Sequence, residues 1–437
     1  MLSRLASIAL LALCLTVSSP AWAQETPAPS QMADRGSAIA ALLSDERIET
    51  ALAQLEAMRD INNTRLVAMN EIPAPPFAEG ERANDLARRM RQAGLDDVTL
   101  DEVGNVIGRR QGEIGGDTIA IVAHIDTVFP EGTDVTVQRD GDLFTAPGIG
   151  DNTRGLVALL SLIDVLEAGN IRTEDTLLFI GSVGEEGLGD LRGVRHLFRD
   201  DADAIDALIA IDGGDAARLV VTAVGSLRYR VTFHGPGGHS YSAFGTAHPH
   251  QALAEAIVRF TEAATPITEN GTKATFSVGR ISGGTSVNSI PFESIMEVDM
   301  RSADPEQLDA LHQAFLGAID AALLAENERR REGPELTVTL DPIGNRPPGQ
   351  GDISQSLIQH AVAAFAAMGI ESELAESSTD ANIPISLGIP AVTISRGGVS
   401  RDAHSLRESW EDVDAHIALQ SALLLILAEA GLLDSAE

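Results

Sequence analysis

Three apolar runs of strand length, each ending in acidic or imidazole side chains, restrict the fold of this chain more than any other feature. The runs are TIAIVAHIDTVF from Thr118, DTLLFIGSVGEEG from Asp175 and DALIAIDGGD from Asp206. Such uninterrupted runs are typical of central parallel strands, whose two faces are both covered. Helical patterns lie between them, beginning at Leu156 and Leu191. We therefore predict an α/β fold with a mostly parallel sheet flanked by helices.

Polar side chains follow each predicted strand at the point where it meets solvent. These side chains are His124 and Asp126, Glu185 and Glu186, and Asp212. The carboxyl ends of parallel strands share one edge of the sheet, where ligands bind, so we expect these side chains to lie close together. The adjacent carboxylates Glu185 and Glu186 repel each other, and a bound cation would offset that repulsion.

The first 23 residues have the pattern of a cleaved secretory signal. An apolar run over residues 5–17 is too short to span a membrane, and the small residues Ala21 and Ala23 form a cleavage site. We expect a periplasmic or secreted protein without a stable membrane anchor after cleavage. The single cysteine, Cys14, lies in this segment. Any metal site in the mature chain would therefore use histidine, aspartate and glutamate.

The charge of the chain is strongly acidic, with 31 lysines and arginines against 64 aspartates and glutamates and a formal net charge of −33. Nucleic-acid binding depends on clustered basic side chains that contact phosphates. This composition therefore excludes nucleic acid as an expected partner. The acidity is sufficiently explained by solubility and does not identify a substrate.

From about Ser226 the pattern changes to two repeats of strand and helix in the order β-α-β-β-α-β. This is the order of the ferredoxin-like split unit. We predict an inserted α+β domain that serves as a lid or a dimerisation surface. The predicted divisions are a flexible N-terminus at 24–37, catalytic parts at 38–225 and 345–437, and the inserted domain at 226–344.

Seven short motifs occur in a fixed order along the chain. They are AHIDTVF, GIGDNTRG, GEEG, AIDGG, GPGGHS, TSVNSIP and AHSLRESW. Together with the inserted domain, they resemble the co-catalytic zinc exopeptidases and amidohydrolases. That family includes tripeptidase T, glutamate carboxypeptidase of the bacterial carboxypeptidase G type, and acetylornithine deacetylase. Each motif is weak by itself, but the resemblance covers nearly the whole chain after the signal.

The resemblance implies two Zn²⁺ ions, or another divalent metal such as Co²⁺ or Mn²⁺, bridged by Asp151 and a water or hydroxide. One ion would also bind His124 and Asp212, and the other would bind Glu186 and His404. The resemblance also implies a cis peptide bond directly after Asp151. Taken alone, Asp151 is equally consistent with a helix N-cap.

The same resemblance implies that Glu185 is the general base, which removes a proton from the bridging water and passes it to the leaving amine. Asp126 would orient His124. A pair of metal ions would lower the pKa of the water and polarise the scissile carbonyl. Proton transfer by Glu185 would then contribute roughly 10²- to 10⁴-fold.

Three residues of the predicted inserted domain are implied to contact substrate. His239 would help to hold the oxyanion, reaching across a homodimer formed through that domain. Asn288 and Arg301 would bind a carboxylate or the backbone of the substrate, for which arginine is well shaped. The alternatives are structural: a surface histidine in a glycine-rich turn, a turn residue and an ion pair at a strand end.

The expected function is that of an exported metal-dependent exopeptidase acting on short peptides. The alternative is an amidohydrolase that cleaves an N-acyl amino acid or another small amide at the same site. The motifs do not separate the two, because the chemistry at the metal is common to both and the pocket decides. A non-catalytic binding protein is disfavoured by the presence of Glu185 and every ligand. A serine hydrolase is disfavoured because GHSYSAFG lacks the G-x-S-x-G spacing.

Overall fold

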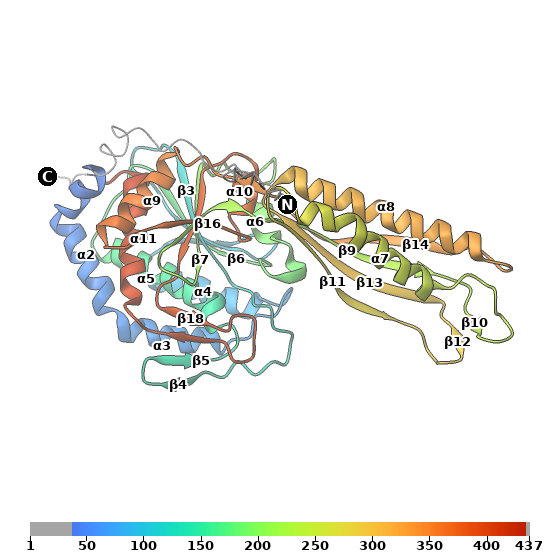
Figure 1. The fold of residues 1–437 in the computed structure, drawn as a ribbon. Coiled ribbons are helices and arrows are strands. Elements are labelled where there is room, and N and C mark those ends of the chain that lie inside the picture. Colours follow the sequence, from blue (N-terminus) through green and yellow to red (C-terminus); the bar gives the residue numbers. More distant parts are fainter. Residues whose placement is uncertain (1–36, 434–437) are drawn as a thin grey trace, which may run out of the picture.

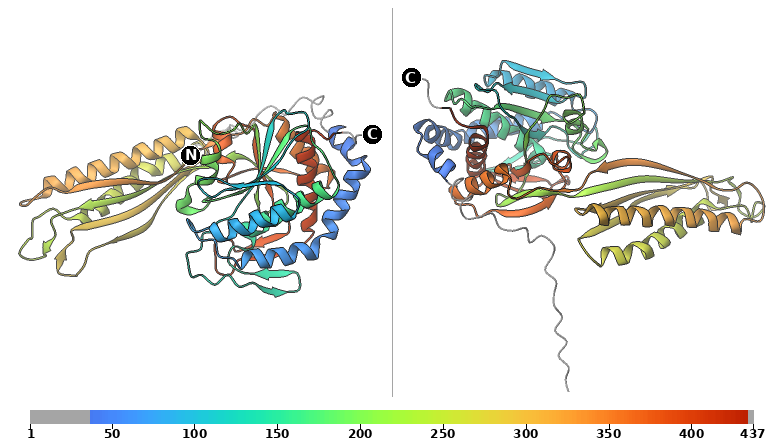
Figure 2. Two further views of the ribbon diagram at one scale, coloured as in Figure 1. Left: turned by 180° about the vertical axis from the view of Figure 1, so that it is seen from behind. Right: turned by 90° about the horizontal axis from the view of Figure 1, so that it is seen from above.

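The structure is a computed structural model that describes residues 37–433. The chain forms a rounded body and an elongated lobe that extends from it, as Figures 1 and 2 show. The predicted signal at 1–23 lies outside the described residues, as does all but the last residue of the predicted flexible segment at 24–37.

The body is built on a nine-stranded sheet in which the predicted apolar strands lie side by side. Its strands are β1 (Asp97–Leu100), β2 (Val106–Arg110), β3 (Thr118–His124), β6 (Thr176–Ser182), β7 (Ala207–Gly213), β8 (Arg218–Ala223), β15 (Gly349–Gln350), β16 (Glu373–Ser377) and β17 (Ala391–Ser395). The order is β1-β2-β6-β3-β7-β17-β8-β15, and β16 pairs with β8. β3 is parallel to both β6 and β7, and β17 is parallel to β7. The predicted fold class is therefore confirmed.

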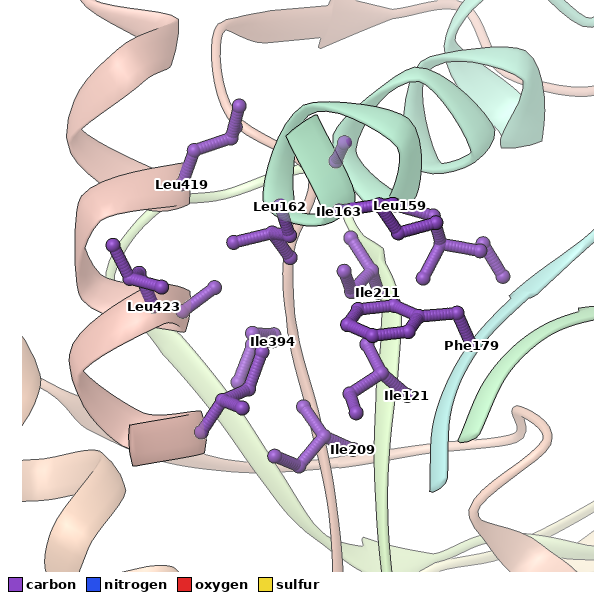
Figure 3. Close-up of a cluster of buried hydrophobic side chains, with 14 of the residues drawn as sticks. Ile121, Leu159, Leu162, Ile163, Phe179, Ile209, Ile211, Ile394, Leu419 and Leu423 are labelled. Carbon is purple, nitrogen blue, oxygen red and sulfur yellow. The ribbon is translucent and has the colours of Figure 1, made fainter. Parts of the chain in front are cut away.

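Helices cover both faces of this sheet. They are α2 (Glu46–Ala57), α3 (Arg59–Asn70), α4 (Gly80–Gln92), α5 (Gly155–Ala168), α6 (Arg192–Leu197), α9 (Ser356–Ala367), α10 (Asn382–Ser386) and α11 (Ala415–Ala430). Alternate side chains of β3 point to opposite faces. Ile121 belongs to the larger core, where Figure 3 shows side chains of α5 and α11, whereas Val122 joins a second core with Val194 of α6. Burial on both faces explains why these strands are apolar throughout.

The elongated lobe follows the predicted β-α-β-β-α-β order. Its elements are β9 (Gly225–His234), α7 (Pro249–Thr268), β11 (Ala274–Gly283), β13 (Glu293–Ser302), α8 (Pro305–Arg329) and β14 (Thr337–Arg346). They form an antiparallel sheet in the order β11-β13-β9-β14 with a core of its own. Among residues 37–433, α8 alone has the length and composition of a membrane span. Leu311, Phe315 and Ile319 of α8 pack in the core of the lobe, which accounts for its apolar face.

Two smaller sheets complete the fold, and neither was predicted. β10 (Gly238–His239) and β12 (Ser289–Ile290) pair at the far end of the lobe, away from the body (Figure 1). A four-stranded sheet in the body consists of β4 (Gln138–Asp140), β5 (Leu143–Thr145), β18 (Val399–Arg401) and β19 (Ser409–Glu411), in the order β18-β19-β5-β4. These strands have two to three residues each, too few to leave an alternating pattern.

Candidate metal centre

The predicted metal ligands come from separate elements that meet at one edge of the body sheet. His124 ends β3, Glu186 follows β6, and Asp212 lies near the end of β7. Asp151 precedes α5, and His404 lies between β18 and β19. Strands β6, β3 and β7 are neighbours in the sheet, in that order. Their carboxyl ends therefore bring His124, Glu186 and Asp212 together.

Three candidate groups of donor atoms occur here: one is His124, Glu185 and Glu186, and the other two share Asp151. Of these two, one is His124, Asp151 and Asp212, and the other is Asp151, Glu186 and His404, with all donor atoms of a group within 4.8 Å of one another. His124 Nε2 lies 3.2 Å from Asp151 Oδ1 and 3.5 Å from Asp212 Oδ1. His404 Nε2 lies 2.8 Å from Glu186 Oε1 and 3.2 Å from Asp151 Oδ2. Each carboxylate oxygen of Asp151 therefore faces a different group.

The segment that carries Asp151 is held by hydrogen bonds from its backbone N–H groups to the side chain of Glu408. The turn begins at Gly148, whose φ of 78° favours glycine. The carboxylate of Glu408 accepts hydrogen bonds from the backbone N–H groups of Gly148, Gly150 and Asp151, at 3.0, 2.9 and 2.8 Å. The peptide bond between Asp151 and Asn152 is cis, as the resemblance implied. Glu408 was not predicted, although it lies inside the AHSLRESW motif.

Asp126 connects His124 to the glutamate pair. Its carboxylate oxygens accept the backbone N–H groups of Glu185 and Glu186 at 3.0 and 2.8 Å. Its main-chain oxygen lies 3.0 Å from His124 Nδ1, whereas its carboxylate Oδ1 is 3.7 Å away. A carbonyl only accepts, so Nδ1 donates and a neutral His124 keeps the Nε2 lone pair for a metal. The contact with His124 thus comes from the backbone of Asp126, and the carboxylate fixes the glutamates.

The electrostatics of the cluster favour a bound cation. Burial and the neighbouring Glu185 raise the pKa of Glu186 to about 7, and burial raises the pKa of Asp212. Hydrogen bonds to Asp151 and Glu186 raise the pKa of His404 to about 10. Burial by itself lowers the pKa of His124, but its hydrogen bonds to Asp151 and Asp212 hold that pKa well above its usual value. Burial by itself raises the pKa of Asp151, but the charge of Arg396 and hydrogen bonds from the two histidines hold that pKa well below its usual value. A divalent cation would therefore displace a proton chiefly from Glu186, whose pKa lies near neutrality.

The donor set itself fits a pair of divalent metal ions. Two imidazoles and three carboxylates without a thiol are ligands that zinc accepts, and the carboxylates also suit Mn²⁺. A carboxylate whose two oxygens face two donor groups has the shape of a bridging ligand.

Two buried arginines at this edge were missed by sequence reasoning. Arg396 Nη1 donates to Asp151 Oδ1 and to Asp212 Oδ1, each at 3.1 Å. Arg346 Nη1 donates to Glu185 Oε1 at 2.9 Å, and its Nη2 donates to the main-chain oxygen of Glu185. An arginine next to a strand is usually exposed, so no local pattern marks these two as buried.

A buried carboxyl, Asp380, also lies behind the cluster and was not predicted. Ser182 Oγ donates to Asp380 Oδ2 at 2.5 Å. Burial and the charge of Glu185 raise the pKa of Asp380 to about 8. Asp380 therefore holds a proton at neutral pH, which avoids a further negative charge beside the glutamate pair.

A cavity of about 390 Å³ opens onto the cluster. Its lining includes Asp151, Glu185, Glu186, Asp212, His404, Arg228, Arg301 and Arg346, with residues 377–379 on another side. Arg301, a predicted substrate contact, is therefore at the site, where Asp299 Oδ2 accepts from its Nε at 2.7 Å. Asp299 Oδ1 accepts from Arg228 Nε at 3.0 Å. The cavity combines the acidic metal ligands with three arginines.

The other two predicted substrate contacts, His239 and Asn288, lie away from the metal-site cavity of their own chain. His239 belongs to β10, and Asn288 directly precedes β12, at the far end of the elongated lobe (Figures 1 and 2). Both side chains are exposed, and Ser240 N–H donates to the main-chain oxygen of Asn288 at 2.9 Å. The structure of a single chain therefore does not bring them to the metal ligands.

A mostly parallel body sheet that brings carboxylates and imidazoles together at one edge has the donor set of a metal-dependent hydrolase. Peptidase family M20/M25/M40 matches residues 120–429 of the chain, which belongs to this family. The protein is thus a metal-dependent hydrolase of peptide or amide bonds, and the family predicted from the motifs is confirmed.

Curated relatives extend over most of the chain. The uncharacterized protein YqjE of Bacillus subtilis is 28% identical over 356 residues, which cover 77% of this chain and 91% of that protein. Succinyl-diaminopimelate desuccinylase of Corynebacterium glutamicum is 23% identical over 355 residues, which cover 79% of this chain and 92% of that enzyme.

Solved structures share the fold. Aminopeptidase PepT from Bacillus cereus has a TM-score of 0.65 and 22% identity, with coverage of 84% of this chain and 97% of that one. The YXEP protein of Bacillus subtilis, described as a dinuclear metal-binding M20 peptidase, has a TM-score of 0.61 and 18% identity, with coverage of 86% and 99%.

Proposed function

We propose that this protein is an exported exopeptidase that hydrolyses short peptides at a site for two Zn²⁺ ions. The observation that carries the proposal is the position of Asp151, whose Oδ1 faces His124 and whose Oδ2 faces His404. His124 and Asp212 would complete one metal site, and Glu186 and His404 the other. Imidazole in both groups favours zinc, while Co²⁺ or Mn²⁺ could also be held.

The metal ions, when bound, supply Lewis-acid polarisation of the scissile carbonyl and lower the pKa of the attacking water. Glu185 takes the proton of that water and returns it to the nitrogen of the leaving amine. Asp126 fixes the backbone of Glu185, and Arg346 holds its Oε1 at 2.9 Å. These two contacts orient the carboxylate before substrate arrives, which reduces the reorganisation needed for proton transfer.

The three arginines of the cavity support a substrate with a free carboxylate. Arg228, Arg301 and Arg346 line the same space as the metal ligands. Guanidinium groups pair with carboxylates in a planar, bidentate geometry, and the C-terminus of a di- or tripeptide would provide one. An N-acyl amino acid also ends in a carboxylate. The same arginines would therefore bind the substrate of an amidohydrolase, which differs from a peptide in the group on the other side of the scissile bond.

A homodimer through the elongated lobes would give His239 and Asn288 a role in catalysis. Both lie at the exposed end of the lobe, beside Tyr241, which is 89% exposed, and Val287, which is fully exposed. Large apolar side chains at such exposure are typical of a contact surface. In a dimer, the lobe of one chain would bring these residues to the cavity of the other, where His239 would help to hold the oxyanion.

Export is supported by the signal pattern of residues 1–23. We expect the secreted protein to begin at Gln24 and to carry no membrane anchor. N-terminal sequencing of protein recovered from the periplasm or medium tests this, and a retained Met1 would overturn it.

The function is tested with metal-loaded protein and a mass-spectrometric panel. The panel contains a tripeptide with free ends, its N-acetylated and C-amidated forms, and an N-acetyl amino acid. We expect cleavage of the free tripeptide and a loss of about tenfold or more in kcat/KM on C-amidation, because the charge-assisted contacts of the carboxylate are lost. Equal cleavage of the amide would refute the carboxylate anchor, and preference for the N-acetyl amino acid would establish the alternative.

Glu185→Gln is the matched control for that panel. Glutamine keeps the size of Glu185 but cannot accept the proton, so we expect kcat to fall roughly 10²- to 10⁴-fold. The bound metal should stay unchanged, because Glu185 is not one of the proposed ligands. Unchanged turnover would remove Glu185 from the role of general base.

A further inference from the structure

We propose that the body contains a second ligand site, separate from the metal centre, in which Arg154 binds a small organic monocarboxylate. The site is a cavity of about 450 Å³ between α2, α3 and the chain around the start of α11. It shares no lining residue with the cavity at the metal ligands. The proposal does not depend on the proposed peptidase activity.

Arg154 is a buried cation with two unpartnered nitrogen atoms. The residue is 2% exposed, and within residues 37–433 its buried Nε and Nη1 have no hydrogen-bond partner. Its guanidinium carbon lies 5.1 Å from the centre of the Trp410 ring. Burial lowers the pKa of Arg154 to about 10, so it remains charged at neutral pH. A buried, unpaired charge is costly, which makes an anionic ligand favourable here.

Asp412, a carboxylate that lines the same cavity, is engaged by other groups through its Oδ2. Asp412 accepts hydrogen bonds from Arg59 Nε at 3.0 Å and from Asn63 Nδ2 at 2.9 Å. It raises the pKa of Arg154 through its charge but forms no ion pair with it in the described part of the chain. Asp412 thus offsets part of the charge of Arg154, while Nε and Nη1 of Arg154 have no hydrogen-bond partner among the described residues.

The remaining walls indicate the kind of anion. Leu55, Leu419 and Trp410 are buried and line the cavity, so a ligand with an apolar part would gain from burial. The lining carries the carboxylates Glu56, Asp412 and Asp414 against the guanidinium groups of Arg59 and Arg154, so it has no excess of positive charge for a multiply charged anion such as phosphate. A monocarboxylate with a short apolar chain fits both the apolar lining and the charge of Arg154.

One segment that lines the cavity also reaches the metal centre. Arg154 is the last residue of Ile149–Arg154, the segment that holds Asp151. A ligand bound to Arg154 would therefore stabilise the segment that holds the bridging carboxylate, without contacting a metal ligand itself.

Tryptophan fluorescence tests the proposal directly. The chain has two tryptophans, Trp22 and Trp410, so the full chain with Trp22→Phe reports on Trp410 alone. We expect butyrate to cause a saturable change, acetate and chloride to bind more weakly, and butylammonium to cause no change. Arg154→Gln should weaken butyrate binding about tenfold or more, because a hydrogen bond to a charged group is lost.

Controls separate this site from the other cavity and from misfolding. Arg301→Gln alters an arginine of the metal-site cavity and should leave the fluorescence titration unchanged. Arg154→Lys keeps the charge and should bind butyrate more tightly than Arg154→Gln. If Arg154→Gln does not fold, the titration with Arg154 in place still decides. No saturable response to butyrate, or equal responses to butyrate and chloride, would overturn the proposal.

Discussion

Asp151 shows how one side chain can organise a centre made of distant residues. Its two oxygens face the two donor groups, and Glu408 fixes its backbone through three N–H groups of the same turn. Arg396 contacts the oxygen that faces His124. The position proposed for a bridging ligand therefore follows from backbone contacts as much as from the identity of the side chain.

The shared position of Asp151 predicts unequal effects of two isosteric substitutions on metal content. Asp151→Asn removes charge from both groups, so we expect both ions to be lost on dialysis. Asp212→Asn affects only the group of His124, so we expect one ion to remain. Elemental analysis by mass spectrometry after dialysis measures both.

Asp215→Asn is the control for that experiment, because Asp215 lies three residues beyond Asp212 but outside both donor groups. It should keep the full metal content. Equal metal retention in the Asp151 and Asp212 variants would contradict the bridging assignment.

At the scale of elements, the strand order decides which residues meet. The sequence places His124, Glu186 and Asp212 at the ends of three strands, but only the order β6-β3-β7 makes those strands neighbours.

Helix ends contribute in a different way, through caps that satisfy backbone N–H groups near the start of each helix. Asp45 is such a cap, since its Oδ1 accepts the backbone N–H of Arg47 at 2.8 Å at the start of α2.

The Asp45 cap predicts a pH-dependent contribution to stability. Asp45→Ala should lower the free energy of unfolding by about 1 kcal/mol at neutral pH. Hydrogen bonding from Arg47 lowers the pKa of Asp45 below its ordinary 3.8. The stabilisation is therefore fully present above 3.8, the value for the unfolded chain, and is lost as the pH falls through the lower folded-state pKa.

Urea unfolding of the unaltered protein and of Asp45→Ala, at neutral pH and at a pH well below 3.8, measures this effect. The difference in the free energy of unfolding between the two proteins should shrink at the acid pH. A difference that is absent at neutral pH, or that grows on acidification, would show that the cap does not contribute as described.

At the scale of the molecule, body and elongated lobe have separate hydrophobic cores, which supports their proposed division into two domains. The connections between them are not loose linkers. β9 and β14 pair where they enter the body, with Ser226 opposite Arg346, and both residues are buried. The chain thus passes between the two parts as paired strands.

This arrangement predicts where limited proteolysis will act. Arg331 lies in an exposed turn between α8 and β14, whereas Arg346 is buried and Arg228 is held in β9 by Asp299. We expect trypsin to cleave after Arg331 well before it cleaves after Arg228 or Arg346. Mass spectrometry of the fragments over time measures the order, and early cleavage at either connection would contradict the paired-strand junction.

The sequence by itself determined the central strands of the body, the helices that separate them and which side chains are candidate metal ligands. These features are local, because a buried strand needs a continuous apolar run and a metal needs donor atoms of fixed chemistry. The fold class and the family followed from them.

Only the tertiary structure decided which distant side chains meet. Arg346, Arg396 and Glu408 reach the centre from more than 150 residues beyond the residues that they contact. It also placed His239 in β10 and Asn288 beside β12, at the far end of the lobe, and left two nitrogen atoms of Arg154 without a hydrogen-bond partner among residues 37–433, beside a cavity. Periodicity reports which face of an element is buried, whereas the neighbours across that face depend on the packing of the whole chain.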